Sequence, residues 1–350
     1  MRYFNAVILN FALISAAVAA PLGIDHAWDG VSDPLIMSSK FERKFSKLPA
    51  TGKAKDETKF WSGDYWALFL GNINYRWNAE YKTGFNLKSP SKQTAMSMSE
   101  SQLASLAPSE KYDLLTGNYN YPVRNDVYNM SYPNAAEWEG ICHGWAPAAM
   151  NHSEPMPKIL TSVDGIKIPF GSSDIKALLS YYYAYKHEVD NTHQMGERCY
   201  GGRCAEDLNA GAFHIVLANK IGLEGVGFIA DVDRYWEVWN HPVHSYTTSV
   251  VEESSYPYRY SAHGTVKVLR VRTAMSYIDE SVGNSWQAML GTPAQVYKTK
   301  NYEYYLDINA SNEIIGGEWI SAERPDFLWL KAKPAKFVGI LSRLGDLLND

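Results

Sequence analysis

Cysteine is scarce in this chain of 350 residues, which has only Cys142, Cys199 and Cys204. So few thiols exclude a small fold held together by several disulfides. Their spacing from the neighbouring histidines also matches no usual pattern of zinc ligands. We therefore expect no metal site, and we expect no cofactor.

Long apolar runs are also rare, because none after the first twenty residues is long enough to span a membrane. The apolar stretch at the start follows Arg2 and ends at Ala17-Val18-Ala19. A charged start, an apolar stretch and small residues at its end are typical of a cleaved secretory signal. We predict a signal peptide over residues 1–19, cleaved near Ala19, and a secreted or periplasmic protein without a membrane span.

A surplus of basic residues is lacking as well, since 33 Lys and Arg face 38 Asp and Glu, for a net charge of −5. Nucleic-acid binding proteins usually carry a basic stripe, so we expect no nucleic-acid partner. The chain shows no internal repeat. We expect an N-terminal region or pro-segment over 20–105, one catalytic core over 106–335, and a tail or short helix over 336–350.

The cysteines have different predicted roles. Between Cys199 and Cys204 lie two glycines, which favour a turn and a short disulfide loop in an exported protein. That pairing leaves Cys142 as the odd thiol, which indicates a reactive group or an intermolecular partner. Cys142 stands at the predicted start of a helix, where exposed N–H groups favour the thiolate. We interpret it as a nucleophile, although a buried structural cysteine would show similar neighbours.

A histidine and a carboxylate follow Cys142 in the chain. The run 211–219 predicts a strand carrying His214, and the run 228–232 predicts a second strand carrying Asp231. If these strands pair, Asp231 can accept the N–H of His214 and fix its tautomer. Asn240 is the alternative orienting residue, because Cys-His-Asn is another common arrangement. Trp145, Trp236 and Trp239 are candidates to bind substrate and exclude water from the thiol.

The order of cysteine on a helix, then histidine and an acid or amide on strands, is that of papain-like and transglutaminase-like folds. Further strands are predicted over 266–271, 302–308 and 314–320. We therefore expect an α+β fold with a papain-like or transglutaminase-like core. In it the helix bearing Cys142 packs on an antiparallel β-sheet, after a mainly helical N-terminal region.

Several separated motifs resemble the transglutaminase elicitor family, which was defined on secreted Phytophthora enzymes and has bacterial members. The matching segments are 142–148, the His214 segment, 237–243, 314–319 and 325–330. The resemblance implies a calcium-independent protein-glutamine γ-glutamyltransferase with Cys142, His214 and Asp231 as its catalytic residues. Its implied partners are proteins with accessible glutamine and lysine side chains.

The resemblance is imperfect in one functional segment. The elicitor peptide of that family contains Val-Trp-Asn-Gln-Pro-Val, and His241 stands here in place of the glutamine. This departure argues against recognition by plant immunity. Two other activities remain open on the same residues, a papain-like protease and a glutamine deamidase. A non-catalytic binding protein that keeps the fold is a third hypothesis.

Overall fold

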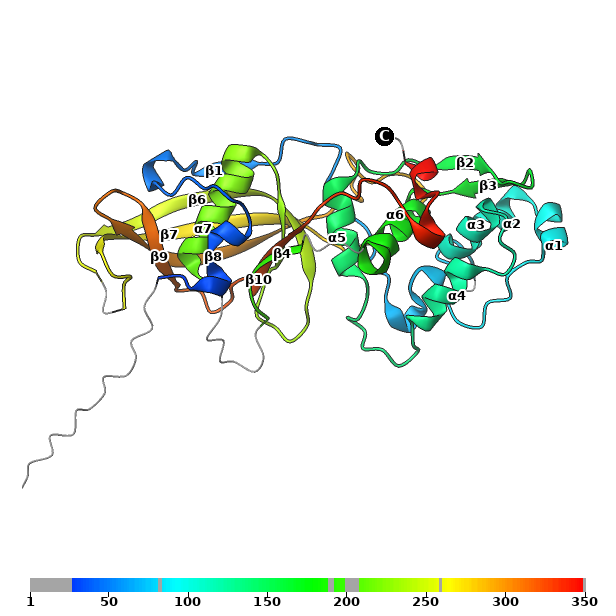
Figure 1. Cartoon of the computed structure of the whole chain (residues 1–350), viewed down its shortest axis with the longest axis horizontal. Helices are drawn as coiled ribbons and strands as arrows, with labels where there is room; N and C mark the ends of the chain where they lie inside the picture. Colours follow the sequence, from blue (N-terminus) through cyan, green and yellow to red (C-terminus); the bar gives the residue numbers. More distant parts are fainter. Residues whose placement is uncertain (1–26, 81–83, 188–191, 199–207, 258–259, 349–350) are drawn as a thin grey trace, which may run out of the picture.

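The computed structural model describes residues 27–80, 84–187, 192–198, 208–257 and 260–348. The molecule is elongated, with a β-sheet half and a helical half, and a central helix stands where the two meet (Figure 1). The predicted signal peptide and the predicted Cys199–Cys204 disulfide lie outside the described residues. Within those residues, no helix is long and apolar enough to cross a membrane.

The sheet half contains one large antiparallel sheet. Its strands lie in the order β4-β10-β5-β6-β7-β8-β9, and β1 pairs with the middle of β6. The bounds are β1 Thr51–Lys53, β4 Thr192–Gly196, β5 Phe228–Asp231, β6 Asn240–Ser254, β7 Thr265–Ile278, β8 Tyr297–Asn309, β9 Ile314–Trp319 and β10 Phe327–Lys331. The predicted strands over 266–271, 302–308 and 314–320 therefore correspond to parts of β7, β8 and β9.

The helical half gathers short helices around the central one. Their bounds are α1 Lys92–Ser97, α2 Glu100–Ala104, α3 Pro108–Leu115, α4 Pro122–Asn129, α5 Cys142–Asn151 and α6 Ser172–Tyr181. A hairpin of β2 Lys158–Thr161 and β3 Lys167–Phe170 turns at Gly165, which has a φ of +84° that favours glycine. Before residue 105 the described chain forms β1, 3-10 turns and two helices of six and five residues.

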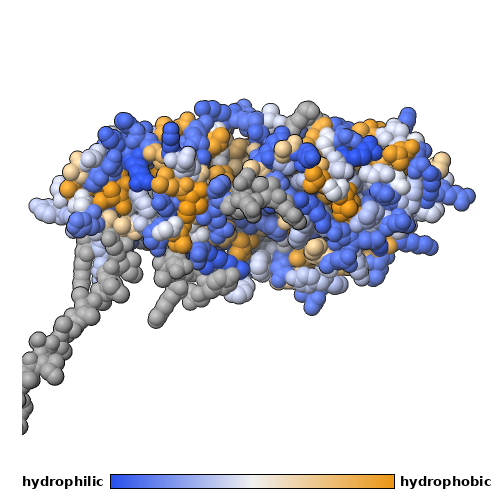
Figure 2. All heavy atoms as spheres, in the orientation of Figure 1, coloured by the Kyte–Doolittle hydropathy of each residue, from blue (hydrophilic) through white to orange (hydrophobic). Residues whose placement is uncertain are grey.

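Each half has its own hydrophobic core. One core lies among α3, α5 and α6, and the C-terminal segment completes it with Leu341, Leu344 and Leu347. The other lies between the sheet and α7 Ala210–Leu217, which lies across one sheet face (Figure 1). Apolar residues on the face drawn in Figure 2 form separate patches among hydrophilic ones, so much of the apolar surface is kept inside these cores.

The segment carrying His214 is a helix, so the predicted strand over 211–219 is wrong. Asn209 caps this helix by accepting hydrogen bonds from the N–H groups of Gly211 and Ala212. All eight residues of α7 are buried, so the segment is apolar on every side and carries no alternating pattern. A short apolar run of this kind does not distinguish a strand from a buried helix by periodicity.

Glycines allow two close approaches that fix these layers. A Cβ on Gly211 would lie 2.3 Å from the carbonyl oxygen of Gly316, so α7 lies directly against the backbone of β9. A Cβ on Gly144 would lie 2.0 Å from the carbonyl oxygen of Ser180. The helix that begins at Cys142 is therefore held against α6 at a distance that only glycine permits.

Candidate active site

Cys142 is the first residue of α5 and a free, buried cysteine with 5% of its surface exposed. The residue before it is fixed from the far N-terminal region, because the Ile141 N–H donates to the carbonyl of Tyr65 at 2.7 Å. The thiol itself lies 3.8 Å from the carbonyl of Val238, to which it donates. The first residue of α5 and the segment that leads into β6 therefore meet at the sulfur atom.

The amide side chain of Asn240 is the closest polar partner of this sulfur. Its Nδ2 donates to the Sγ of Cys142 at 3.5 Å, and its Oδ1 accepts from the indole N–H of Trp329 at 2.8 Å. Asn240 opens β6, and Trp329 lies on β10. The sheet therefore orients the amide, and the amide orients the thiol. Asn240 lies beside Cys142 itself, rather than acting on His214.

The thiol is protonated in this arrangement. Burial, with a smaller effect of the nearby Glu280 carboxylate, raises the pKa of Cys142 to about 11, although hydrogen bonds from Asn240 act in the opposite direction. The expectation that the start of the helix favours a thiolate is not met here, because the loss of hydration outweighs the helix dipole. A base must remove the proton before the sulfur can act as a nucleophile.

His214 lies in the core beneath the sheet. Its Nδ1 is 2.8 Å from the hydroxyl of Tyr304, and its ring stacks on Phe45. Burial lowers the pKa of His214 to about 4, so the ring is neutral near pH 7. Among the described residues, no hydrogen bond joins His214 to Cys142 or Asp231. The predicted pairing on neighbouring strands is wrong because α7 carries the histidine across a sheet face.

Asp231 does lie near the thiol, but not beside His214. It ends β5 opposite Asn240 in the antiparallel register, and its side chain is fully buried. Oδ1 accepts the backbone N–H of Trp239 at 3.3 Å, while Oδ2 has no hydrogen-bond partner among the described residues. Burial raises the pKa of Asp231 to about 9, so the carboxyl group is neutral near pH 7. A neutral acid is a poor partner for an imidazolium ion.

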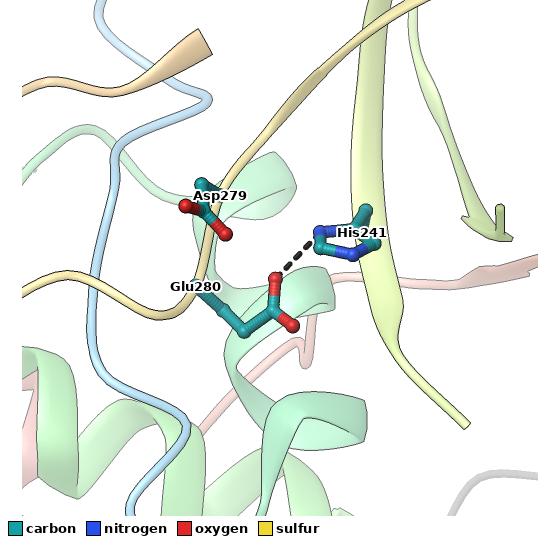
Figure 3. Close-up of side chains that lie close together, drawn as sticks. All are labelled: His241, Asp279 and Glu280. Atoms are coloured by element: carbon teal, nitrogen blue, oxygen red, sulfur yellow. Dashed lines mark ion pairs between the residues drawn. The ribbon is translucent and has the colours of Figure 1, made fainter. Parts of the chain in front are cut away.

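A second histidine, His241, directly follows Asn240 in the chain. The sequence comparison with the elicitor peptide marked it only as a departure from that peptide. The Nδ1 of His241 is 2.5 Å from Oε2 of Glu280, and Figure 3 shows this pair. The same nitrogen is 2.9 Å from the carbonyl of Ile278. Glu280 is 1% exposed and lies in the loop that follows β7. The only feature of the sequence that could have indicated a role for His241 was its position directly after Asn240.

His241, Asp279 and Glu280 also have the spacing of a metal site, since their ligand atoms lie within 4.8 Å of one another. Both carboxylates have partners, however. Lys298 lies 2.9 Å from Asp279, and His241 contacts Glu280. The ammonium group of Lys298 would oppose a second cation, so the arrangement favours ion pairs over a metal site.

The three tryptophans predicted to bind substrate have different surroundings. Trp145 is completely buried in the helical core, so in this structure it is a packing residue. Trp236 is 64% exposed, and the guanidinium of Arg198 lies over its ring. Trp239 is partly exposed, with its ring centroid 5.3 Å from that of Tyr65. Of the three, Trp239 directly follows the residue whose carbonyl accepts from the thiol.

A free cysteine at a helix start, an asparagine on the adjoining strand and a buried histidine–glutamate pair are groups of the kinds that cysteine enzymes use. A sequence model of the family described as "Transglutaminase elicitor" matches residues 36–343, and the chain belongs to that family. No curated protein matches the chain.

The fold is also similar to a solved structure, the GP42 transglutaminase from Phytophthora sojae. The two share 22% sequence identity and a TM-score of 0.66, over 91% of this chain and 96% of that one. The mixed fold of helices and antiparallel sheet is therefore shared over almost the whole length of both proteins.

Proposed function

We propose that this protein is a protein-glutamine γ-glutamyltransferase with Cys142 as its nucleophile, on a core arranged like that of papain-like enzymes. The observation that carries the proposal is the free thiol at the start of α5, oriented by Asn240 in a member of the transglutaminase elicitor family. Substrates are proteins with accessible glutamine and lysine side chains.

In the first half of the reaction, the sulfur attacks the side-chain carbonyl carbon of a glutamine. The N–H groups of Cys142 and His143, at the start of α5, are suited to stabilise the resulting oxyanion. The carbon–nitrogen bond then breaks, ammonia leaves with a proton from the base, and a thioester remains on Cys142.

We assign the role of base to His241. Its Nδ1 faces Glu280, so Nε2 is the nitrogen that can take the thiol proton. Two observations support the assignment over His214. Glu280, the partner of His241, acts electrostatically on the Cys142 thiol. Burial is the one cause of the pKa shift of His214, and no hydrogen bond among the described residues joins that ring to the thiol. Glu280 contacts Nδ1 and so holds the orientation of the imidazole.

In the second half, a lysine amine attacks the thioester carbon. The carbon–sulfur bond breaks, an isopeptide forms, and the proton lost by the amine returns to the sulfur through His241. Water in place of the amine gives glutamate, which is the deamidase reaction. The two activities therefore differ only in the acceptor.

Three variants test the assignment with a glutamine donor and a fluorescent amine. Cys142→Ala should abolish amine incorporation and ammonia release. His241→Asn should lower kcat by about 100-fold or more, as expected for loss of a general base. His214→Asn, checked for folding by circular dichroism, is the matched control and should retain incorporation within a few-fold.

The opposite pattern would overturn the base assignment, namely loss of activity with His214→Asn and retention with His241→Asn. Mass spectrometry of a glutamine-containing protein separates the activities on these residues. Isopeptide cross-links support the proposal, whereas glutamate products alone or cuts in the backbone indicate a deamidase or a protease. Full activity in excess EDTA is the result expected for calcium independence.

Export and the disulfide are part of the same proposal. The mature chain begins near Ala20, and Cys199 pairs with Cys204 after the chain reaches an oxidising compartment. N-terminal sequencing of the protein recovered from the medium or periplasm tests the first point. Peptide mapping without reduction tests the second, and free thiols at both positions would contradict it.

A further inference from the structure

A cavity of about 390 Å³ lies between the segment 64–77 and the loop that follows Glu280. None of the proposed catalytic residues lines it. Its walls are lined by Asp64, Tyr65, Ala67, Leu70, Tyr75 and Trp77, together with residues 281–284.

The cavity adjoins the candidate catalytic residues on two sides. On one side, the carbonyl of Tyr65 holds the N–H of Ile141, the residue before Cys142, and the Tyr65 ring packs on Trp239. On the other, Ser281 follows Glu280 directly. The cavity therefore adjoins residues next to the proposed nucleophile and to Glu280, and Asn240 is not among its lining residues.

The lining is acidic and aromatic. Asp64 accepts the Trp66 N–H at 2.8 Å and the Asn284 side-chain amide at 2.6 Å. These neutral donors hold its carboxylate in place, and no described residue forms an ion pair with it. Burial raises the pKa of Asp64 to about 6, so the group is mostly ionised at pH 7 and above.

Aromatic rings complete this environment. Tyr65, Tyr75 and Trp77 all line the cavity, and none of the described lining residues is Lys or Arg. The electrostatic effect of Asp64 on the pKa values of Tyr65 and Tyr75 indicates that both hydroxyl groups lie near the carboxylate. A carboxylate flanked by ring faces attracts an organic cation that carries an apolar stem.

We propose that this cavity is the acceptor subsite, which takes the ammonium and methylene chain of a primary amine such as a lysine side chain. Asp64 is the counter-ion, and Tyr75 and Trp77 flank the stem. The inference rests on the proposed transglutaminase function and names the residues that select the second substrate.

The protons balance as follows. The bound ammonium releases one proton to solvent when it becomes an amine. Its nitrogen then attacks the thioester carbon, the carbon–sulfur bond breaks, and the second proton passes through His241 to the sulfur. The products are the isopeptide and the free thiol, and no further reactant is required.

Asp64→Asn is the main test, because the amide keeps the size of the side chain and can still accept from Trp66. With cadaverine as the amine, we expect KM for the amine to rise about ten-fold or more. KM for the glutamine donor, measured by ammonia release without amine, should stay within about two-fold. Asp56→Asn is the matched control, since Asp56 is an exposed carboxylate outside this cavity.

Tyr75 gives a second, independent pair of variants. Tyr75→Leu removes the ring and should raise KM for cadaverine several-fold, whereas Tyr75→Phe keeps the ring and should restore it. Because this pair leaves Asp64 in place, it remains informative if Asp64→Asn fails to fold.

The outcomes separate the inference from the function on which it rests. Absence of ammonia release and amine incorporation in the wild-type protein refutes the function. An active wild type, with unchanged KM for cadaverine in Asp64→Asn and Tyr75→Leu, refutes only the subsite. A rise in KM for the glutamine donor instead of the amine shows that the cavity holds the glutamine, which also overturns the inference.

Discussion

Replacing Asp231 by asparagine should stabilise this protein, and the gain should grow with pH. The carboxyl group is fully buried, and burial raises its pKa from 3.8 to about 9. The native state therefore favours the neutral acid. Its contribution to stability is fully present below about pH 4 and is lost as the pH rises toward 9. Asparagine does not ionise, so the stability of the variant does not decline in this way. The difference in unfolding free energy between variant and wild type therefore grows as the pH rises.

The magnitude follows from the two pKa values. Between pH 4 and pH 9 the difference grows by up to about 1.4 kcal/mol per pH unit, which sets a ceiling of about 4 kcal/mol at pH 7. Part of this gain is cancelled. The new Oδ1 keeps the bond from Trp239, but the new NH₂ group replaces Oδ2, which has no partner in the part of the chain that the structure describes, at a cost of about 1–3 kcal/mol. We expect a net gain of about 1–3 kcal/mol at pH 7.

The assay is urea unfolding at several pH values between 4.5 and 8.5, with Asp56→Asn as the exposed-carboxylate control. The same preparations report on catalysis. An ionised Asp231 that oriented a histidine would make Asp231→Asn lose activity by several orders of magnitude. We expect activity to be retained. A variant less stable than the wild type at every pH, or a difference that does not change with pH, would refute the reasoning.

Three other predictions concern the thiol and the buried framework. Cys142, whose thiol pKa is raised from 9.0 to about 11, should react with iodoacetamide at pH 7.5 about 100 times more slowly than it does in the urea-unfolded chain. Mass spectrometry measures both rates, and equal rates would contradict the burial of the thiol. Asp174→Ala should lower the free energy of unfolding in urea by about 3–5 kcal/mol, because it leaves the fully buried Lys111 without the carboxylate that lies 2.7 Å away. Glu57→Ala, which breaks the exposed Lys53–Glu57 pair, is the control and should lower it by under about 1 kcal/mol. Gly144→Ala should lower both the melting temperature and the activity, since its Cβ would collide with the carbonyl of Ser180; an unchanged melting temperature would show that α5 can move freely.

Local patterns predicted the parts of this fold that local interactions stabilise. The strands β7, β8 and β9 follow from alternating side chains. The helix that begins at Cys142 was also predicted from its own segment. The buried run around His214 was misread because a segment that is apolar on every side has no period to identify it.

The sequence by itself determined the family, the nucleophile candidate and most of the elements around it. The tertiary structure decided the partners of that nucleophile. Asn240 lies 98 residues after Cys142. Glu280 lies 39 positions beyond His241, just after the end of β7, the strand that pairs with β6. Such pairs depend on sheet register and on the face that a helix covers, which are set by long-range packing and leave no mark in the local pattern. The position of the proposed base was therefore open until the fold placed His241, rather than His214, beside the residues that contact the thiol.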